Sequence, residues 1–446
     1  MRIAIIGGGI SGLTLAWHLQ KAGLSYDLFD ASADAGGNIR SEQAGSYLLE
    51  TGPNSLQLSP ELEELIADLR MTDQIEDTAA VSKNRYVLRG GQYRKLPGSP
   101  PALLASGFFS LKTKLHLLRE LRRPAGPVNE QETLGNFFRR RFDQEIVDYA
   151  LNPFISGIYA GDPDQLLVHK TFPSLPRLEQ TYGSVLKGLA KSGGGAGRRR
   201  IISVKGGLQQ LPRTLAARLT GYHGNQAVTG LVRQPDGRYS VQAPAAEEQL
   251  YDNVVLALPA YLAGQLLETL FPAEAAALSA VYYPPMTAIF TAYRRADVAH
   301  PLDGFGALHP KVENPYAAGS IWTSSIFPGR CPADQVLFTS FVGGVQYEAQ
   351  ARDPEETQKA SVHAELSRRY GIRASEPLWQ GRYYWDKAIP QFDHRIGAAH
   401  AAADALAGQG IYAAANWRAG VGVPDCVRHA RQLAVELGSR PGQAKE

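Results

Sequence analysis

The sequence predicts an α/β protein built around a Rossmann-like parallel sheet, and three runs of residues carry that prediction. Residues 2–6 are a β-branched run followed at once by a glycine-rich turn and a helical stretch, which is how a doubly wound unit begins. Residues 252–259 and 410–415 also have the composition of short buried strands. The predicted sheet therefore takes its strands from both ends and the middle of the chain, with other material inserted between them.

Composition removes several classes of protein. The 446 residues are 44% hydrophobic and 20% charged, enough apolar material for a large core, so global disorder is excluded. A net charge of +3 is too small to predict nucleic-acid binding. Cys331 and Cys426 lie far apart without metal-ligand spacing, so we expect no disulfide framework and no metal site, and a reducing compartment fits. No apolar run approaches the roughly 20 residues of a transmembrane helix.

The first motif is a glycine-rich turn that predicts a phosphate cradle. It is the GxGxxG sequence Gly7-Gly8-Gly9-Ile10-Ser11-Gly12. In such a turn the first glycine permits the tight bend, the second lets the backbone approach a pyrophosphate, and the third lets the helix pack on the strand. A helix over 13–21 would present its N-terminal N–H groups to the phosphates. A second strand over 26–29 ends in Asp30, which is placed to accept a hydrogen bond from a ribose hydroxyl.

Further segments favour FAD over a nicotinamide dinucleotide. Glycine-dense loops at 36–41 and 49–54 follow the ribose acid, where a nicotinamide enzyme would pass directly to its next βα unit. Residues 416–425 lead into a second helix, with Pro424 suited to its first position. The N-terminus of that helix would stabilise negative charge on a reduced isoalloxazine. In the middle of the chain we expect a strand over 227–232 and a hairpin turn at 235–237.

Six segments are more specific than these motifs, and they occur in a fixed order along the chain. They are residues 50–55, 84–88, 153–163, 304–306, 341–344 and 420–426. With them the chain resembles the FAD-dependent protoporphyrinogen oxidases, within the amine-oxidase-like flavoprotein group, over nearly its whole length. One departure is Asp30, where the wider group more often has Glu, and this change preserves the acceptor.

The resemblance implies an α/β (α+β) fold in three parts. The Rossmann-like FAD-binding domain, of the amine-oxidase/p-hydroxybenzoate-hydroxylase type, would comprise residues 1–80, 201–262 and 388–446. An antiparallel-sheet substrate-binding domain would comprise residues 81–96 and 263–387. A helical membrane-associated insertion would comprise residues 97–200. In that insertion we expect Phe108 and Phe109 to be exposed beside a basic helix, a pattern typical of interfacial binding.

The resemblance also assigns roles to individual residues. Arg85 would meet a substrate propionate, the carbonyl of Gly157 would face the tetrapyrrole, and Leu308, Ile321 and Phe341 would sandwich the macrocycle. The cofactor residues expected from the motifs and the resemblance together are Gly7, Gly8, Gly9, Ile10, Ser11, Gly12, Asp30, Ala31, Gly37, Asn38, Gly52, Pro53, Asn54, Ser55, Val228, Trp417, Val421, Gly422 and Val423. FAD is expected to be bound non-covalently, and no catalytic acid or base is assigned.

The implied reaction is oxidation of a porphyrinogen by molecular oxygen with hydrogen peroxide as by-product. Protoporphyrinogen IX is the leading substrate, and coproporphyrinogen III, which has more carboxylates, stays open. A flavin amine oxidase, a carotenoid desaturase, and a porphyrin or flavin carrier without turnover stay open as well. We expect a cytoplasmic protein bound peripherally to the cytoplasmic face of the membrane. Hand-over of product to a ferrochelatase and assembly as a homodimer are further expectations, and no nucleic-acid partner is expected.

Overall fold

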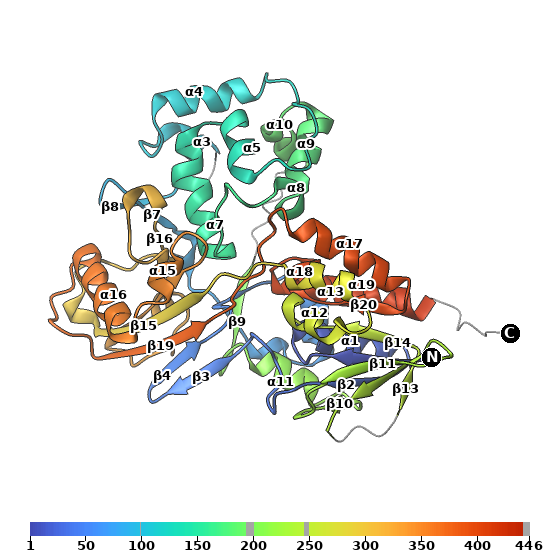
Figure 1. Ribbon diagram of the computed structural model, residues 1–446. Coiled ribbons are helices and arrows are strands. Elements are labelled where there is room, and N and C mark those ends of the chain that lie inside the picture. The colour runs from blue at the N-terminus through green and yellow to red at the C-terminus, as the bar shows by residue number, and fades with distance from the viewer. Residues whose placement is uncertain (99, 193–199, 245–248, 440–446) are drawn as a thin grey trace.

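The computed structural model describes residues 1–98, 100–192, 200–244 and 249–439. Figure 1 shows three parts: a parallel sheet with helices on both faces, an antiparallel sheet beside it, and a group of short helices that stands over both. Within the described residues no helix is both long enough and apolar enough to cross a bilayer.

The parallel sheet has the order β10-β2-β1-β14-β20, and every neighbouring pair in it is parallel. Its strands are β1 (Arg2–Ile6), β2 (Ser25–Phe29), β10 (Tyr222–His223), β14 (Asn253–Leu256) and β20 (Ile411–Ala413). Ile5 pairs with Leu28 on one side and Val255 on the other, and all three are completely buried. The prediction that both ends and the middle of the chain build one parallel sheet is confirmed.

Helices cover both faces of this sheet. One face, bearing Ile3 and Ile5, carries α1 (Ile10–Lys21), α2 (Pro60–Asp68), α11 (Gln210–Ala216) and α19 (Val423–Ser439). The opposite face, bearing Ala4 and Ile6, carries α12 (Ala260–Leu267), α13 (Pro272–Ser279) and α17 (Ile396–Ala407). A domain boundary after residue 262 would split α12 and separate α13 from α17, against which it packs. Helices α12 and α13 therefore belong with the parallel sheet.

The second sheet has seven strands in the order β19-β15-β18-β17-β16-β7-β8. They are β7 (Tyr86–Arg89), β8 (Gln92–Lys95), β15 (Met286–Arg294), β16 (Gly306–Leu308), β17 (Gly319–Trp322), β18 (Gln335–Gly343) and β19 (Trp379–Trp385). All pairs are antiparallel except β16 with β7. Helix α16 (Glu355–Tyr370) covers one face through Val362 and Leu366. The expected antiparallel sheet is thus confirmed, and Ala288 and Phe290 of its opposite face pack against Tyr47 and Leu49.

Further short elements lie beside the two sheets. They are the hairpin β3 (Ser41–Ala44) and β4 (Tyr47–Glu50), the sheet of β5 (Leu56–Gln57), β6 (Ile75–Asp77) and β9 (Ile201–Val204), the sheet of β11 (Gly230–Arg233), β12 (Tyr239–Gln242) and β13 (Leu250–Tyr251), and the helices α14 (Thr323–Ile326), α15 (Glu348–Ala351) and α18 (Asn416–Ala419). The strand predicted over 227–232 begins only at Gly230, so Val228 lies in an extended connection before it. The ring of Tyr47 stacks on Trp379 at 4.9 Å, which ties the β3–β4 hairpin to the antiparallel sheet.

The helical part consists of α3 (Pro100–Ala105), α4 (Leu111–Glu120), α5 (Leu134–Arg141), α6 (Gln144–Ile146), α7 (Asn152–Tyr159), α8 (Val168–Thr171), α9 (Ser174–Tyr182) and α10 (Val185–Lys191). Residues 193–199 of the predicted insertion lie outside the described residues. The expectation of exposed aromatics is wrong: Phe108 and Phe109 are both buried, and the guanidinium of Arg89 covers the Phe108 ring at 5.5 Å. The exposed large apolar residues described in this region are Leu111, Leu115, Leu118, Val128, Phe154, Ile158 and Leu189, and the first three form one helical face of α4.

Candidate functional site

The glycine-rich turn leaves open space where a phosphate would lie. A Cβ on Gly12 would stand 2.1 Å from the carbonyl oxygen of Gly7, so only glycine lets α1 approach the strand this closely. A Cβ on Gly9, by contrast, would meet no atom within 4 Å. Gly9 is also the N-cap of α1 and provides no side-chain cap for the first N–H groups. Helix α2 differs, because the Ser59 hydroxyl caps it. The N-terminus of α1 is thus free to bind an anion.

Asp30, the predicted ribose-binding acid, directly follows β2 at the carboxyl end of that strand, and backbone N–H groups orient its carboxylate. The Asp30 carboxylate accepts hydrogen bonds from the backbone N–H groups of Gly8 and Ser32. Ala31 follows it on the exposed surface, and the backbone N–H of Gln226 reaches the Asp30 carbonyl, which brings the segment before Val228 alongside. These bonds fix the carboxylate while leaving part of its acceptor capacity for a ligand.

Sequence reasoning missed Tyr222, whose hydroxyl is buried near Asp30 without a partner among the described residues. Burial, followed by the negative charges of Asp30 and Asp34, raises the pKa of Tyr222 to about 12. Its strand, β10, consists of two residues only, which is too short for a sequence pattern to reveal.

The loops that follow fold back onto the glycine turn. A Cβ on Gly37 would lie 3.2 Å from the Cα of Gly9, and one on Gly52 would lie 1.8 Å from the carbonyl oxygen of Asn38. Pro53, Asn54 and Ser55 continue from Gly52 as a partly buried loop. The Oδ1 atom of Asn54 is buried without a partner among the described residues, so it can accept a hydrogen bond from a bound group. The first cofactor segments predicted from sequence are therefore neighbours in space.

The C-terminal cofactor segment is only partly available. Trp417 is completely buried, and its indole N–H donates to the carbonyl of Leu258 at 3.0 Å. Its side chain is therefore a core residue, and only its backbone could contact a cofactor. Val421, Gly422 and Val423 are partly exposed where α19 begins. Burial raises the pKa of the Cys426 thiol to about 11, so little thiolate exists near neutral pH for covalent flavin attachment.

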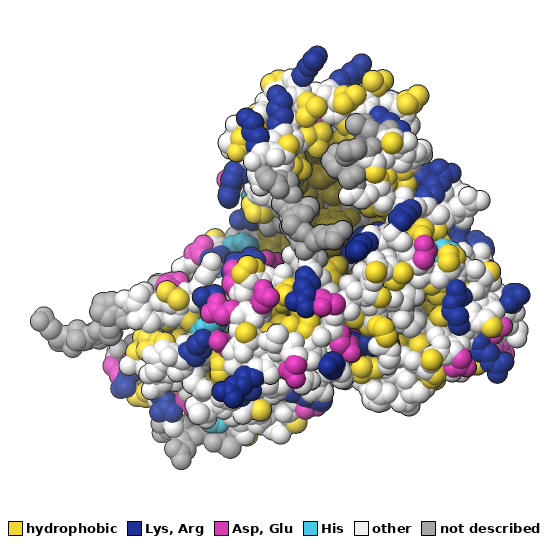
Figure 2. Space-filling model, turned by 180° about the vertical axis from the view of Figure 1, so that it is seen from behind, with side chains coloured by type: hydrophobic (Ala, Val, Ile, Leu, Met, Phe, Trp, Pro, Cys, Tyr) yellow, Lys and Arg dark blue, Asp and Glu magenta, His cyan; other side chains and the backbone are white. Residues whose placement is uncertain are grey.

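The predicted macrocycle residues meet on one face of the antiparallel sheet. Gly319 pairs with Leu308 on one side and with Phe341 on the other, and paired residues point to the same face. Ile321 is two residues further along the same strand and shares that face. All three side chains are partly exposed, and a Cβ on Gly157 of α7 would lie 2.8 Å from Leu308. The result is an apolar wall with α7 opposite. Figure 2 shows hydrophobic side chains lining a hollow beneath the helical part.

Arg85 lies next to β7 at the edge of this wall. Its guanidinium stacks on the ring of Phe305 at 4.4 Å. No carboxylate among the described residues forms an ion pair with it. The side chain reaches solvent, yet the surrounding protein atoms lower the pKa of Arg85 below the usual arginine value. A stacked arginine without an acidic partner is suited to bind the carboxylate of a ligand.

A buried ion pair joins the cofactor segments to the antiparallel-sheet domain. Arg330 donates through Nη1 to Oε1 of Glu50 at 3.0 Å and through Nη2 to the Ser203 hydroxyl. Glu50, which directly precedes the loop 51–55, also accepts from the Ser41 hydroxyl at 2.6 Å and from the backbone N–H of Leu208 at 3.0 Å. Burial raises the pKa of Glu50, and these donors and Arg330 oppose that rise. Sequence reasoning did not identify this pair.

The fold and the site define a scaffold with a phosphate cradle of the dinucleotide-binding type at the parallel sheet and an apolar wall on the antiparallel sheet. Residues 10–437 match the flavin-containing amine oxidoreductases, and the chain belongs to that family. The chain is 30% identical to protoporphyrinogen oxidase 2, chloroplastic/mitochondrial, of Arabidopsis thaliana, covering 95% of this chain and 91% of that protein. It is 26% identical to coproporphyrinogen III oxidase of Bacillus subtilis, covering 95% of each. The resemblance to protoporphyrinogen oxidases is thereby confirmed.

A solved structure supports the fold. The crystal structure of a protein from Exiguobacterium sp. 255-15, assigned provisionally as a protoporphyrinogen oxidase, superposes with a TM-score of 0.81 at 22% identity, covering 98% of both chains. At that identity the likeness concerns the architecture alone.

Proposed function

We propose that the protein catalyses the FAD-dependent oxidation of protoporphyrinogen IX to protoporphyrin IX by molecular oxygen, with hydrogen peroxide as by-product. The observation that carries the proposal is the apolar wall of Leu308, Ile321 and Phe341 with Arg85 at its edge. A porphyrinogen is a large apolar disc with carboxylate arms, which matches such a wall and such a cation. FAD, when bound, would supply successive two-electron oxidations of the macrocycle, with oxygen reduced to hydrogen peroxide in each round until the porphyrin is formed.

The chain's own residues supply binding and orientation in this proposal. The open N-terminus of α1 and Asp30 would hold the diphosphate and ribose of FAD, bound without a covalent link. The wall and Gly157 would hold the macrocycle at a fixed distance from the cofactor cradle. We assign no acid–base residue.

The choice between two porphyrinogens follows from the charge at the wall. Coproporphyrinogen III carries more carboxylates than protoporphyrinogen IX, and each carboxylate removed from water without a partner costs free energy. The three wall residues are apolar, and cations lie at their edge: Arg85, and Arg94, which pairs with Val87 in the row of Leu308. That arrangement favours the substrate with fewer carboxylates. The relative from Bacillus subtilis keeps coproporphyrinogen III as the second candidate substrate.

The deciding experiment has two steps. The visible spectrum of the purified protein after addition of FAD should show a bound flavin. Initial rates with each porphyrinogen, followed by porphyrin fluorescence, should then give a higher kcat/KM for protoporphyrinogen IX. A higher value for coproporphyrinogen III would reverse the assignment, and a flavin-loaded protein inactive on both would refute the proposal.

Arg85→Ala should raise KM for the porphyrinogen about tenfold or more, because a charge-assisted hydrogen bond contributes roughly 1.5–3 kcal/mol. FAD affinity should stay unchanged, since Arg85 lies on the substrate side of the site. Lys95→Ala, which removes an exposed cation of strand β8 that pairs with Tyr86 on the opposite face of the sheet, is the matched control and should leave KM unaltered. Equal KM values for Arg85→Ala and the wild type would remove Arg85 from the substrate site.

We also propose that α4 docks on the cytoplasmic face of a membrane. Its exposed apolar face, Leu111, Leu115 and Leu118, is flanked by Lys112 and Arg119, as in helices that lie in the interface of anionic bilayers. Figure 2 shows Lys and Arg side chains over the same end of the molecule.

Leu115→Asp should reduce co-sedimentation of the protein with phosphatidylserine vesicles several-fold, because it places a negative charge in the apolar face of α4. Val435→Asp changes an exposed apolar residue of α19, more exposed than Leu115, and should leave vesicle binding unaltered. Undiminished binding of Leu115→Asp would exclude α4 as the docking element.

A further inference from the structure

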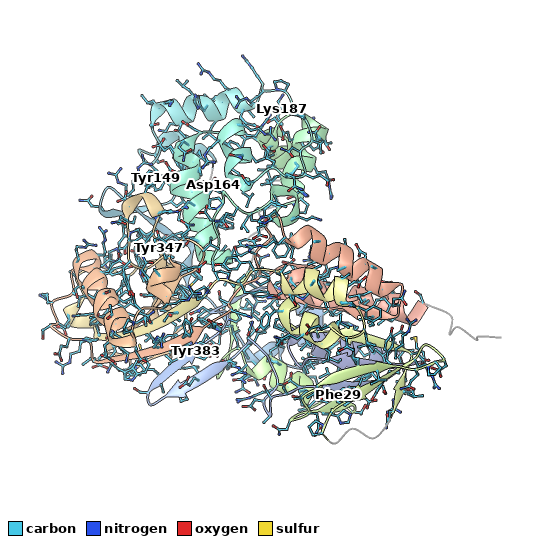
Figure 3. All side chains as sticks on the ribbon, viewed as in Figure 1. Phe29, Tyr149, Asp164, Lys187, Tyr347 and Tyr383 are labelled. Carbon is cyan, nitrogen blue, oxygen red and sulfur yellow. The ribbon has the colours of Figure 1, made fainter. Side chains whose placement is uncertain are left out.

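Strand β19 extends the apolar wall by one aromatic residue that no motif identified. Ala288 of β15 pairs with Phe341 on one side and with Tyr383 of β19 on the other. Because paired residues share a face of the sheet, a single row across the sheet runs Leu308, Gly319, Phe341, Ala288, Tyr383. Figure 3 labels Tyr383 on the antiparallel sheet. Tyr383 therefore lies on the face that carries the wall, in the same row as Phe341.

The surroundings of Tyr383 hold its ring but leave its hydroxyl free. The ring packs edge-on against Trp385, with centroids 4.7 Å apart, and the side chain is partly buried against the cluster that contains Ala288 and Phe290. No described residue forms a hydrogen bond with the Tyr383 hydroxyl. The adjacent Tyr384, on the opposite face, donates its hydroxyl to Asp386 at 3.2 Å. Two neighbouring tyrosines thus differ in what their hydroxyls can bind.

The pyrrole N–H groups of a porphyrinogen need more acceptors than the Gly157 carbonyl alone, and the expected wall side chains provide none. Each pyrrole ring of a porphyrinogen carries an N–H group, and burying that donor without an acceptor costs free energy. Leu308, Ile321 and Phe341 contain no polar side-chain atom. A phenol oxygen has lone pairs to accept such a donor, and a tyrosine ring adds apolar contact area.

We propose that Tyr383 is a substrate-binding residue whose hydroxyl oxygen accepts a hydrogen bond from a pyrrole N–H of the porphyrinogen while its ring packs against the edge of the macrocycle. This proposal rests on the proposed function. It assigns β19 to the end of the wall opposite Leu308 and Gly157.

The test is Tyr383→Phe, which removes only the hydroxyl, with Tyr384→Phe as the matched control on the same strand. KM for protoporphyrinogen IX should rise about 2- to 10-fold in Tyr383→Phe, the range expected from a neutral hydrogen bond of roughly 0.5–1.5 kcal/mol. The dissociation constant for FAD, measured by flavin fluorescence, and the free energy of unfolding should equal those of the wild type. Tyr384→Phe should leave KM and the FAD dissociation constant unchanged.

Three contrary results would each have a definite meaning. Weaker FAD binding with unchanged KM would overturn the inference and make Tyr383 a cofactor residue. Equal KM values in the wild type and in both variants would also overturn it, while leaving the proposed function intact. A wild-type protein that binds FAD but oxidises neither porphyrinogen would refute the proposed function itself, and the inference with it.

Discussion

Arg330→Met is expected to lower the free energy of unfolding by about 3–5 kcal/mol, because it leaves a buried carboxylate without its cation. Glu50 and Arg330 are both almost completely inaccessible to solvent. In the variant the Glu50 carboxylate would keep the Ser41 hydroxyl and the Leu208 N–H as donors but lose its only described ion-pair partner. Urea unfolding of the FAD-loaded protein at pH 7 measures the loss.

The same variant should show a characteristic dependence on pH. Burial already raises the pKa of Glu50 in the folded protein, and loss of Arg330 would raise it further. A carboxyl group whose pKa is higher in the folded than in the unfolded state favours folding below its unfolded pKa, and that contribution is lost as pH rises through the folded value. The destabilisation should therefore be larger at pH 7 than at pH 5.

Two further variants separate the ion pair from a general effect of arginine removal. Arg352→Met breaks an exposed pair with Glu348, 3.1 Å apart, and should change stability by no more than about 1 kcal/mol. Adding Glu50→Gln to Arg330→Met removes the stranded charge and should restore part of the loss. If Arg330→Met cost no more than Arg352→Met, the pair would not hold the cofactor loop to the antiparallel sheet.

Local patterns in the sequence were sufficient to predict the parallel sheet and the glycine-rich turn. The first βαβ unit is contiguous, so residue spacing alone places Gly9, Gly12 and Asp30 in relation to one another. The wall residues could be predicted only from the family resemblance. Leu308 and Phe341 become neighbours because each pairs with the strand that lies between them in the sheet. Nothing in the spacing of two residues 33 positions apart predicts that pairing.

Several aromatic side chains occupy positions that sequence patterns do not predict. Phe108 and Phe109 stand beside a basic helix in the sequence, but both pack into a core cluster with residues far along the chain, and the guanidinium of Arg89, held by Glu145, covers the Phe108 ring. Tyr383 and Tyr384 are adjacent, and only the register with β15 shows which one faces the wall. Trp417 stands in a flavin motif, but the carbonyl of Leu258 binds its indole in the core. The position of each of these side chains depends on tertiary contacts, which residue spacing in the sequence does not reveal.

Gly9→Ala is expected to abolish most FAD binding while leaving the fold intact. The backbone of Gly9 is extended, with φ −75° and ψ 174°, which alanine adopts without strain. The added Cβ would meet no protein atom within 4 Å, so the free energy of unfolding of the FAD-free protein should change by less than about 0.5 kcal/mol. The same methyl group would occupy the space where the pyrophosphate approaches the turn. The FAD dissociation constant, from flavin fluorescence, should rise at least about tenfold.

Gly12→Ala provides the contrasting case, since there the new Cβ would lie 2.1 Å from the carbonyl oxygen of Gly7. That contact forces α1 away from the strand, so Gly12→Ala should destabilise the FAD-free protein as well as weaken cofactor binding. The two variants separate a glycine that makes room for a ligand from one that makes room for the protein's own backbone. Wild-type FAD affinity in Gly9→Ala would show that the cofactor's phosphates do not approach the turn at Gly9, and the proposed cofactor site would have to lie elsewhere.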